Sequence, residues 1–270
     1  VEPDTFNIDV KKMEQAITSK TKAIVPVHLF GQCANMEQIM QLANKQNIFV
    51  IEDNAQAIGG DYIFKNGRKQ KSGTLGHIGC TSFFPSKNLG CYGDGGALFT
   101  NDDELAEKIS SIVNHGMKKR YYHDRIGVNS RLDSIQAAVL SVKLPYLNNY
   151  IEARQKAAEF YNKNFAEVKE LTTPVVADYT NHVFHQYTLK VGNNKRDELK
   201  QWLDEQGVPA MVYYPVPLHR QKAFEKYKQP NDAFPVTEAL SKSVISLPMH
   251  TELDEEQLKF ITQKVKEFFN

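Results

Sequence analysis

The sequence lacks several features that would place it in a special class at once. It has no apolar run long enough to cross a bilayer, because stretches such as AIVPVHLF (23–30) have only the length of a strand. Its formal net charge is +1, so it shows neither the basic excess typical of nucleic-acid binding nor the acidic block typical of disorder. The opening VEPDTFNIDV has no basic start and no apolar core, so no signal-peptide pattern is present. We therefore expect neither a nucleic-acid partner nor a membrane.

Cysteine is also scarce. The chain has three cysteines, Cys33, Cys80 and Cys91, and neither their odd number nor their spacing suits a disulfide framework or a metal site. This usage predicts a protein of the reducing cytoplasm that binds no metal. Cys91 lies close to Lys87 in sequence, but nothing near it would activate a thiol, so we assign it no nucleophilic role.

What is present is an ordinary globular composition, 41% hydrophobic and 24% charged over 270 residues, enough for one large domain or two modest ones. The first half alternates apolar strand patterns (21–30, 48–53 and 78–84) with amphipathic helix patterns (36–47 and 102–116). This alternation predicts an α/β fold with a doubly wound, mostly parallel sheet.

The pattern changes after the middle of the chain. A long helical pattern over 131–165, interrupted by Pro145, is typical of a helix that bridges two domains. Beyond it come shorter strand and helix patterns, among them a strand predicted over 209–216, which favour a smaller α+β unit. We predict a large domain over 1–145, and a bridging helix with a small C-terminal domain over 146–270.

Two of the predicted strands end in reactive groups. Asp53 ends FVIED, and Ser82 and Lys87 lie at and just beyond the end of the next strand. Ligands of open α/β sheets collect at the carboxyl ends of strands, so these residues could meet in one crevice. The pair suits pyridoxal 5′-phosphate (PLP), because a lysine amine forms a Schiff base with the cofactor aldehyde and an aspartate pairs with the pyridinium nitrogen. The ordinary alternatives are a capping aspartate, a solvated lysine and a glycine turn.

Several motifs in order carry a resemblance to a known family. The segments IEDNAQAIGG (51–60), TSFFPSKNLGCYGDGGALFTND (81–102) and RIGVNSRLDSIQAAVL (125–140), followed by YYPVPLH and SLPMHTELDEEQL, resemble the PLP-dependent nucleotide-sugar aminotransferases of the DegT/DnrJ/StrS type. The resemblance covers essentially the whole chain. It implies the PLP transferase fold type I, known from aspartate aminotransferase, with the large domain binding the cofactor.

The resemblance also implies a role for individual residues of the cofactor site. Lys87 matches the lysine that bonds to PLP and carries the proton, and Asp53 matches the carboxylate on the pyridine nitrogen. Gln56 matches a glutamine near the phenolic oxygen, and Ser82 matches a phosphate ligand. Asn129 matches an asparagine that reaches the cofactor of the neighbouring subunit, which implies a homodimer with shared sites.

Arg131, Tyr213, Tyr214 and His219 match positions at which the family contacts the nucleotide sugar. Structural alternatives stay open for several of these residues. Asn129 could cap the helix that follows it, Gln56 could be an ordinary polar residue at a helix start, and one of the two tyrosines could only pack.

The implied reaction is transfer of an amino group from glutamate to a keto group of a nucleotide-linked sugar. The sequence around Lys87 is most similar to that of enzymes that act on UDP-linked 3-keto sugars of the 2-acetamido-hexuronate kind. These enzymes work in bacterial polysaccharide or O-antigen synthesis. One alternative is a PLP-dependent sugar dehydratase, but those enzymes have histidine in place of the lysine. The other is a non-catalytic regulatory or sugar-binding member of the same fold, which the intact set of cofactor residues disfavours.

The chain starts at Val1 with a turn-like segment, whereas the family begins well before this point. The family's earlier part carries a Gly-Thr phosphate turn and an aromatic residue that stacks on the pyridine ring. We therefore expect an N-terminally truncated large domain, and we predict that this chain alone binds PLP weakly or not at all.

Overall fold

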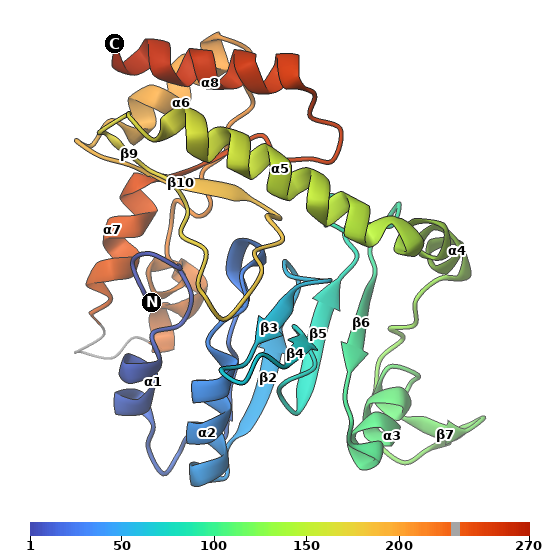
Figure 1. Cartoon of the computed structure of the whole chain (residues 1–270). Helices are drawn as coiled ribbons and strands as arrows, with labels where there is room; N and C mark the ends of the chain where they lie inside the picture. Colours follow the sequence, from blue (N-terminus) through green and yellow to red (C-terminus); the bar gives the residue numbers. More distant parts are fainter. Residues whose placement is uncertain (228–232) are drawn as a thin grey trace.

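The computed structural model describes residues 1–227 and 233–270, and it builds them around two main sheets (Figure 1). The first sheet has the strand order β1-β2-β5-β6. Its strands are β1 (Ala23–Ile24), β2 (Phe49–Asp53), β5 (Ile78–Ser82) and β6 (Gly96–Phe99). The first three run parallel and β6 runs antiparallel to β5. The predicted α/β fold with a mostly parallel sheet is confirmed.

Within this sheet the strand predicted over 21–30 is shorter than expected. Only Ala23–Ile24 pair as a strand, and Val27 adds an isolated bridge to Asp53. Pro26 interrupts the ladder because it has no N–H to donate. The short helix η1 (Leu29–Gly31) then turns the chain away from the sheet.

Helices α1 (Val10–Ala16) and α2 (Met36–Gln46) bury apolar side chains against this sheet. Met36, Ile39 and Ala43 recur at helical spacing and have no exposed surface. Asn35 caps the start of α2 through its side chain, and Asn47 ends it in the left-handed conformation. This part of the core therefore follows directly from the periodicity of the sequence.

Two small hairpins and four further helices complete the chain up to residue 165. The hairpins are β3 (Asp61–Ile63) with β4 (Lys69–Lys71) and β7 (Met117–Lys119) with β8 (Tyr122–His123). The helices are α3 (Asp103–Ile112), α4 (Ser134–Lys143), η2 (Leu144–Tyr146) and α5 (Leu147–Phe165). Pro145 lies in η2, between α4 and α5, where the interruption was predicted. The residue that caps α4 is Asp133, so the alternative of Asn129 as the cap is wrong.

The second main sheet is antiparallel, with β10 (Tyr187–Val191) between β9 (Leu171–Thr172) and β11 (Val244–Leu247). Its core is shared with α5, α6 (Arg196–Glu205) and α8 (Glu255–Phe269). Helix α5 extends from the region of α4 to this sheet (Figure 1). Division of the chain into domains at 145/146 stays a prediction.

The strand predicted over 209–216 is wrong. Only Met211 pairs, through one bridge to Ser246, and Tyr213 and Tyr214 lie in a loop. Pro209 and Pro215 flank the segment and supply no N–H donors, which limits any ladder there. The loop leads into η3 (Leu218–Arg220) and η4 (Lys222–Tyr227), and then past 233 into α7 (Pro235–Ser243).

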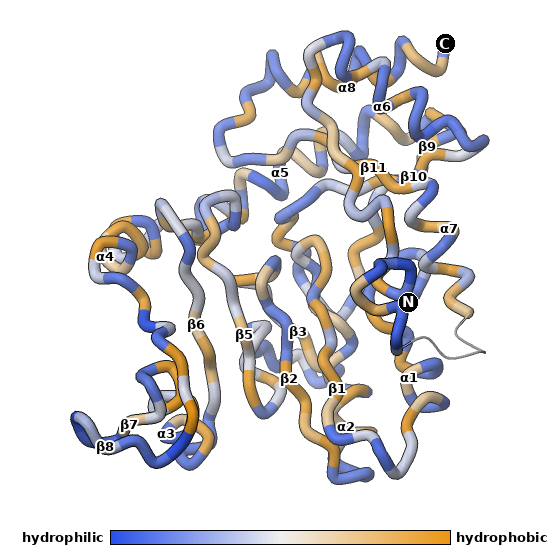
Figure 2. The backbone as a smooth tube through the Cα atoms, turned by 180° about the vertical axis from the view of Figure 1, so that it is seen from behind, coloured by the Kyte–Doolittle hydropathy of each residue, from blue (hydrophilic) through white to orange (hydrophobic). Residues whose placement is uncertain are grey.

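Seen from behind, apolar segments follow the strands of the first sheet, while the hydrophilic tip of the β7–β8 hairpin lies at its edge, on the opposite side from α7 (Figure 2). None of the helices in the described part of the chain combines the length and apolar character of a membrane span.

Candidate active site

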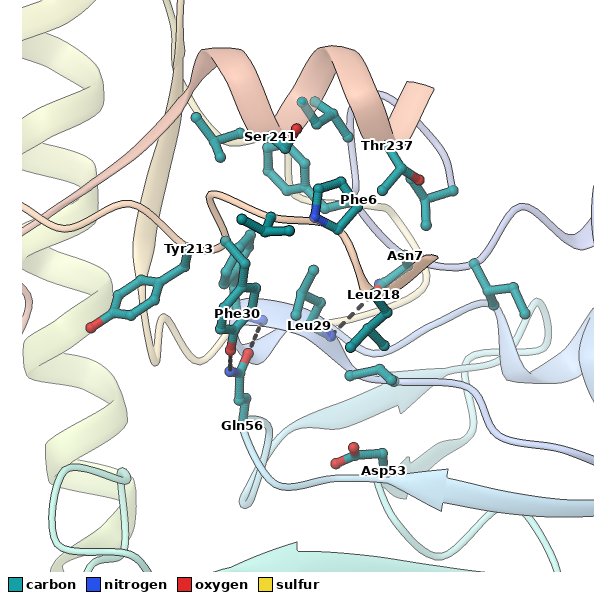
Figure 3. A pocket seen from close by; sticks show the side chains of 18 of the residues that line it. Phe6, Asn7, Leu29, Phe30, Asp53, Gln56, Tyr213, Leu218, Thr237 and Ser241 are labelled. Carbon is teal, nitrogen blue, oxygen red and sulfur yellow. Dashed lines mark hydrogen bonds between the residues drawn. The ribbon is translucent and has the colours of Figure 1, made fainter. Parts of the chain in front are cut away.

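A cavity of about 770 Å³ lies at the carboxyl end of β2 and extends to α7 (Figure 3). Asp53, Gln56 and Lys87 line its floor, and Tyr213, Tyr214 and Leu218 line it from the loop after Met211. Thr237, Leu240 and Ser241 line it from α7. The parallel pairing of β2 with β5 explains why these groups meet: it puts both carboxyl ends at one edge of the sheet.

Asp53 is held in place by its backbone. Its N–H donates to Pro26 at 2.9 Å, and its carbonyl accepts from the N–H of His28 at 3.0 Å. One carboxylate oxygen, Oδ1, accepts from the N–H of Ala55 at 3.1 Å. The other oxygen has no hydrogen-bond partner in the described residues, so it is available to a ligand in the cavity.

Lys87 lies in a compact turn after β5. Its N–H donates to the carbonyl of Phe84 at 2.9 Å, and the neighbouring Asn88 donates its side-chain amide to the carbonyl of Val183 at 3.0 Å. Burial lowers the pKa of Lys87, while the negative charge of Asp53 raises it, with a net lowering. The turn thus presents an amine that loses its proton more readily than a solvated lysine does.

The glycines around this turn allow close packing of the backbone. A Cβ on Gly90 would lie 2.4 Å from the carbonyl oxygen of Pro85, and a Cβ on Gly96 would lie 2.8 Å from that of Thr81. Real Cβ atoms do not approach so closely. Gly90 is therefore needed for the turn around Lys87, and Gly96 for the close pairing of β6 with β5.

Gln56 joins two parts of the cavity wall. Its Oε1 accepts from the N–H of Phe30 at 2.6 Å, and its Nε2 donates to the hydroxyl of Tyr214 at 3.3 Å (Figure 3). The bond to Phe30 fixes which end of the amide is the donor. Gln56 therefore connects the short helix η1, through Phe30, with the loop that carries Tyr213 and Tyr214.

The structure does not place all predicted site residues in this cavity. Ser82 pairs with Gly96 at the end of β5, and its hydroxyl accepts from the N–H of Phe84 at 3.2 Å. Asn129 forms a bridge with Asn114, and Arg131 donates to the Asn114 side chain at 2.8 Å. Asn129 and Arg131 are exposed, and their segment leads from β8 to α4, away from α7 in both views (Figures 1 and 2).

His219 flanks the cavity without lining it. Its Nε2 lies 2.7 Å from Oε1 of Glu238, and its ring packs against Phe234 with 4.8 Å between ring centroids. Tyr213 and Tyr214 do line the cavity. Their predicted contact with a substrate stays a prediction.

Sequence reasoning missed Glu52, the residue beside Asp53. Its carboxylate is completely buried and accepts hydrogen bonds from the His28 side chain and from three backbone N–H groups, those of Gly73, Leu75 and Gly76. A signal was present, because a glutamate in an apolar strand next to a predicted site residue needs partners.

These features can be compared with known proteins. Residues 1–266 match the family described as the DegT/DnrJ/EryC1/StrS aminotransferase family. The chain belongs to this family. Its members are PLP-dependent transaminases, so the chain is an enzyme of that class.

Three relatives show the range of names in the family. A "pleiotropic regulatory protein" of Geobacillus stearothermophilus is 50% identical over 100% of this chain and 71% of its own length. A UDP-2-acetamido-2-deoxy-3-oxo-D-glucuronate aminotransferase of Pseudomonas aeruginosa is 45% identical over 97% of this chain and 70% of its own. A UDP-N-acetyl-3-dehydro-α-D-glucosamine 3-aminotransferase of Acidithiobacillus ferrooxidans is 44% identical over 97% and 68%.

Solved structures show the same fold. A family member from Brucella abortus superposes with a TM-score of 0.92 at 40% identity, covering 100% of this chain and 72% of its own. NtdA from Bacillus subtilis, solved with bound pyridoxamine phosphate, gives a TM-score of 0.89 at 31% identity, covering 100% and 61%. The chain thus spans about two thirds of the length of these proteins, and the PLP transferase fold type I is confirmed.

The residues present fit the family's cofactor. Asp53 offers one unpaired carboxylate oxygen, and Lys87 offers a half-buried amine whose charge interacts with that carboxylate. A pyridinium nitrogen and an aldehyde need these two partners.

Proposed function

We propose that the protein transfers the amino group of glutamate to the keto group of a UDP-linked 3-keto sugar. The observation that carries the proposal is that Asp53, Gln56 and Lys87 line one cavity. The choice of sugar is supported by two relatives at 45% and 44% identity, whose names specify UDP-linked 3-keto sugars. The product would be an amino sugar for bacterial polysaccharide or O-antigen synthesis in the cytoplasm.

In this proposal Asp53, Gln56 and Lys87 hold PLP, with Ser82 as a phosphate ligand. Bound PLP supplies an electron sink for the bonds at the carbon that carries the amine. Asp53 would keep the ring nitrogen protonated through Oδ2, the carboxylate oxygen that has no partner among the described residues. Nζ of Lys87 takes up and returns the proton at the reacting carbon, and burial favours this role because it lowers the pKa of the amine.

Gln56 and the residues of the tyrosine loop would orient the substrate. Gln56 has its amide oxygen occupied by the N–H of Phe30, so only its NH₂ group faces ligands and Tyr214. Tyr213 and Tyr214 line the cavity and, with Arg131 and His219, form the proposed contacts to the nucleotide sugar. The aliphatic side chains around them, such as Leu218 and Leu240, would keep water from the reacting carbon.

A second copy of the chain is part of the proposal. Asn129 and Arg131 are exposed and do not line the cavity of their own subunit. The same segment and helix α4, which follows it, carry large exposed apolar residues: Ile126 is 98% exposed, Ile135 76% and Val142 70%. Such a surface favours a protein interface. In a homodimer, Asn129 and Arg131 would reach the partner's site.

The assignment of Lys87 is tested by Lys87→Ala, with Lys65→Ala as a control that removes an exposed lysine outside the cavity. With PLP in excess and glutamate alone, the wild type and Lys65→Ala should convert the cofactor to its amine form, seen by absorbance. Lys87→Ala should not. Conversion by Lys87→Ala at the wild-type rate would show that the assignment is wrong.

The substrate is tested by glutamate with a panel of UDP- and dTDP-linked keto sugars. The proposal predicts the highest kcat/KM for a UDP-linked 3-keto sugar. Loss of water from a sugar, with no amine transfer, would favour the dehydratase alternative, which the presence of Lys87 disfavours.

A further inference from the structure

Two segments that are distant in sequence form opposite parts of the cavity wall. Leu218 and Gln221 line the cavity from the turn at η3, and Thr237 and Leu240 line it from α7. Leu218 and Gln221 are three positions apart, and residues at this spacing lie on the same side of a 3₁₀ turn. His219 and Arg220, between them, therefore face away from the cavity. The position of the η3 turn relative to α7 therefore sets the width of this part of the cavity.

One carboxylate joins the two segments. Oε1 of Glu238, in α7, lies 2.7 Å from Nε2 of His219 and accepts from Nε of Arg220 at 2.6 Å. The His219 side chain is 15% exposed and that of Glu238 27%, so water screens this contact less than it screens a surface ion pair. The two donors hold the pKa of Glu238 below its usual range, which keeps the carboxylate charged.

In the described part of the chain no other side chain makes a hydrogen bond between the turn and α7, although the His219 ring also packs against Phe234 at the start of α7. The remaining hydrogen bonds of the turn are local: Arg220 N–H donates to Pro217 at 2.9 Å, and the Gln221 side chain donates to Val216 at 3.3 Å. Every hydrogen bond from 217–221 to α7 that the described residues make ends on Glu238. The turn would consequently lose these hydrogen bonds to α7 if this carboxylate were removed.

The same loop continues back to the cofactor residues. Tyr214 lies four residues before Leu218, and its hydroxyl accepts from Gln56. We propose that Glu238 is a positioning residue: by holding His219 and Arg220 it fixes the 213–221 loop, and with it Leu218, Gln221 and Tyr214, for binding of the nucleotide sugar. The inference rests on the proposed function for its substrate.

The test compares Glu238→Ala and Glu238→Gln with Glu255→Ala. Glu255→Ala is the control because, in the described part of the chain, this glutamate pairs with Lys259 of the same helix and with no other residue. Hydrogen exchange of peptides within 213–227 measures how well the loop amides are protected, and it needs no substrate. In Glu238→Ala these amides should exchange about tenfold faster than in the wild type, and in Glu255→Ala they should not change.

Steady-state kinetics with PLP in excess measure how a displaced loop changes the binding of the nucleotide sugar. Glu238→Ala should raise KM for the nucleotide sugar about tenfold, while conversion of the cofactor by glutamate alone changes less than about twofold. Glu238→Gln should show a smaller effect, because its amide oxygen can still accept from Arg220 and His219.

Unchanged exchange in 213–227, a KM equal to that of Glu255→Ala, or an equal loss in the glutamate reaction would each overturn the inference. A wild-type enzyme that aminates no nucleotide sugar contradicts the proposed function alone, and the exchange measurement then decides whether Glu238 holds the loop.

Discussion

Nε2 of His28 lies 2.8 Å from Oε2 of Glu52, and neither side chain has any exposed surface. The other ring nitrogen, Nδ1, accepts from the N–H of Ala34 at 3.1 Å, so the imidazole proton is on Nε2 and is donated to the carboxylate. Glu52 also accepts from the N–H of Gly73 at 2.8 Å and of Gly76 at 2.5 Å. One carboxylate thus joins β2, the segment before η1 and the loop before β5, directly beside Asp53.

This relationship predicts an acid-sensitive fold. Burial alone would raise the pKa of Glu52. The hydrogen bonds from His28 and from the backbone of Gly76 and Gly73 lower this pKa by more, so the net effect is a lowering from 4.5. Because the folded-state pKa is the lower one, ionised Glu52 stabilises the fold above about pH 4.5, and this stability is lost as pH falls through the folded-state pKa.

Glu52→Gln should therefore lower the free energy of unfolding by about 3 kcal/mol at neutral pH, since its NH₂ group meets backbone donors. It should also flatten the acid side of the stability profile. Urea denaturation between about pH 3 and pH 7 measures both effects. The exposed Glu104→Gln is the control, and a steep acid limb retained by Glu52→Gln would contradict the role of Glu52.

A second prediction concerns Gly31, next to the residue that holds Gln56. Gly31 has φ +104°, and a Cβ there would lie 2.9 Å from the backbone nitrogen of His185. Gly31→Ala should therefore cost at least about 2 kcal/mol of stability. The control is Gly67→Ala, also at positive φ (+81°) but with open space around it, which should cost about 1 kcal/mol.

Urea denaturation of the two variants compares these costs. Equal costs for Gly31→Ala and Gly67→Ala would show that backbone strain alone matters and that the close approach of residues 183–185 to Gly31 does not.

The proposed dimer gives a third prediction. Ile135→Asp together with Val142→Asp introduces charge into an apolar surface, so the double variant should be monomeric in sedimentation and should lose most of its activity. The control is Phe260→Asp, at a 44% exposed position in α8. A monomeric wild type, or a double variant that remains dimeric, would contradict the proposed shared site.

Much of this fold could be predicted from the residues because short-range patterns control it. The apolar period of 36–47 gave α2 nearly to its ends, and Pro145 separated α4 from α5 as expected. The same reasoning failed at 209–216, where apolar and aromatic residues imitate a strand. There Pro209 and Pro215 supply no N–H donors, and only Met211 pairs with the edge strand β11, which a local apolar pattern does not reveal.

The candidate site shows a similar division. Motif resemblance predicted Asp53, Gln56 and Lys87, and they line one cavity. It did not predict that Glu238 holds His219, or that Glu52 links three segments beside Asp53, because these contacts join residues 19 and 24 positions apart whose types alone do not indicate a partner. Ser82, Asn129 and Arg131 stay predictions, since none of them lines the cavity of this chain.

The central claim is that the enzyme moves the nitrogen of glutamate to a nucleotide-linked sugar and that Lys87 is needed for this transfer. The most direct test supplies ¹⁵N-glutamate, a UDP-linked 3-keto sugar and excess PLP to the protein and to Lys87→Ala, and follows the sugar by mass spectrometry. The account predicts a UDP-amino sugar that carries the ¹⁵N label with the wild type and none with Lys87→Ala. An unlabelled or unchanged sugar with the wild type, or equal labelling by Lys87→Ala, would contradict it.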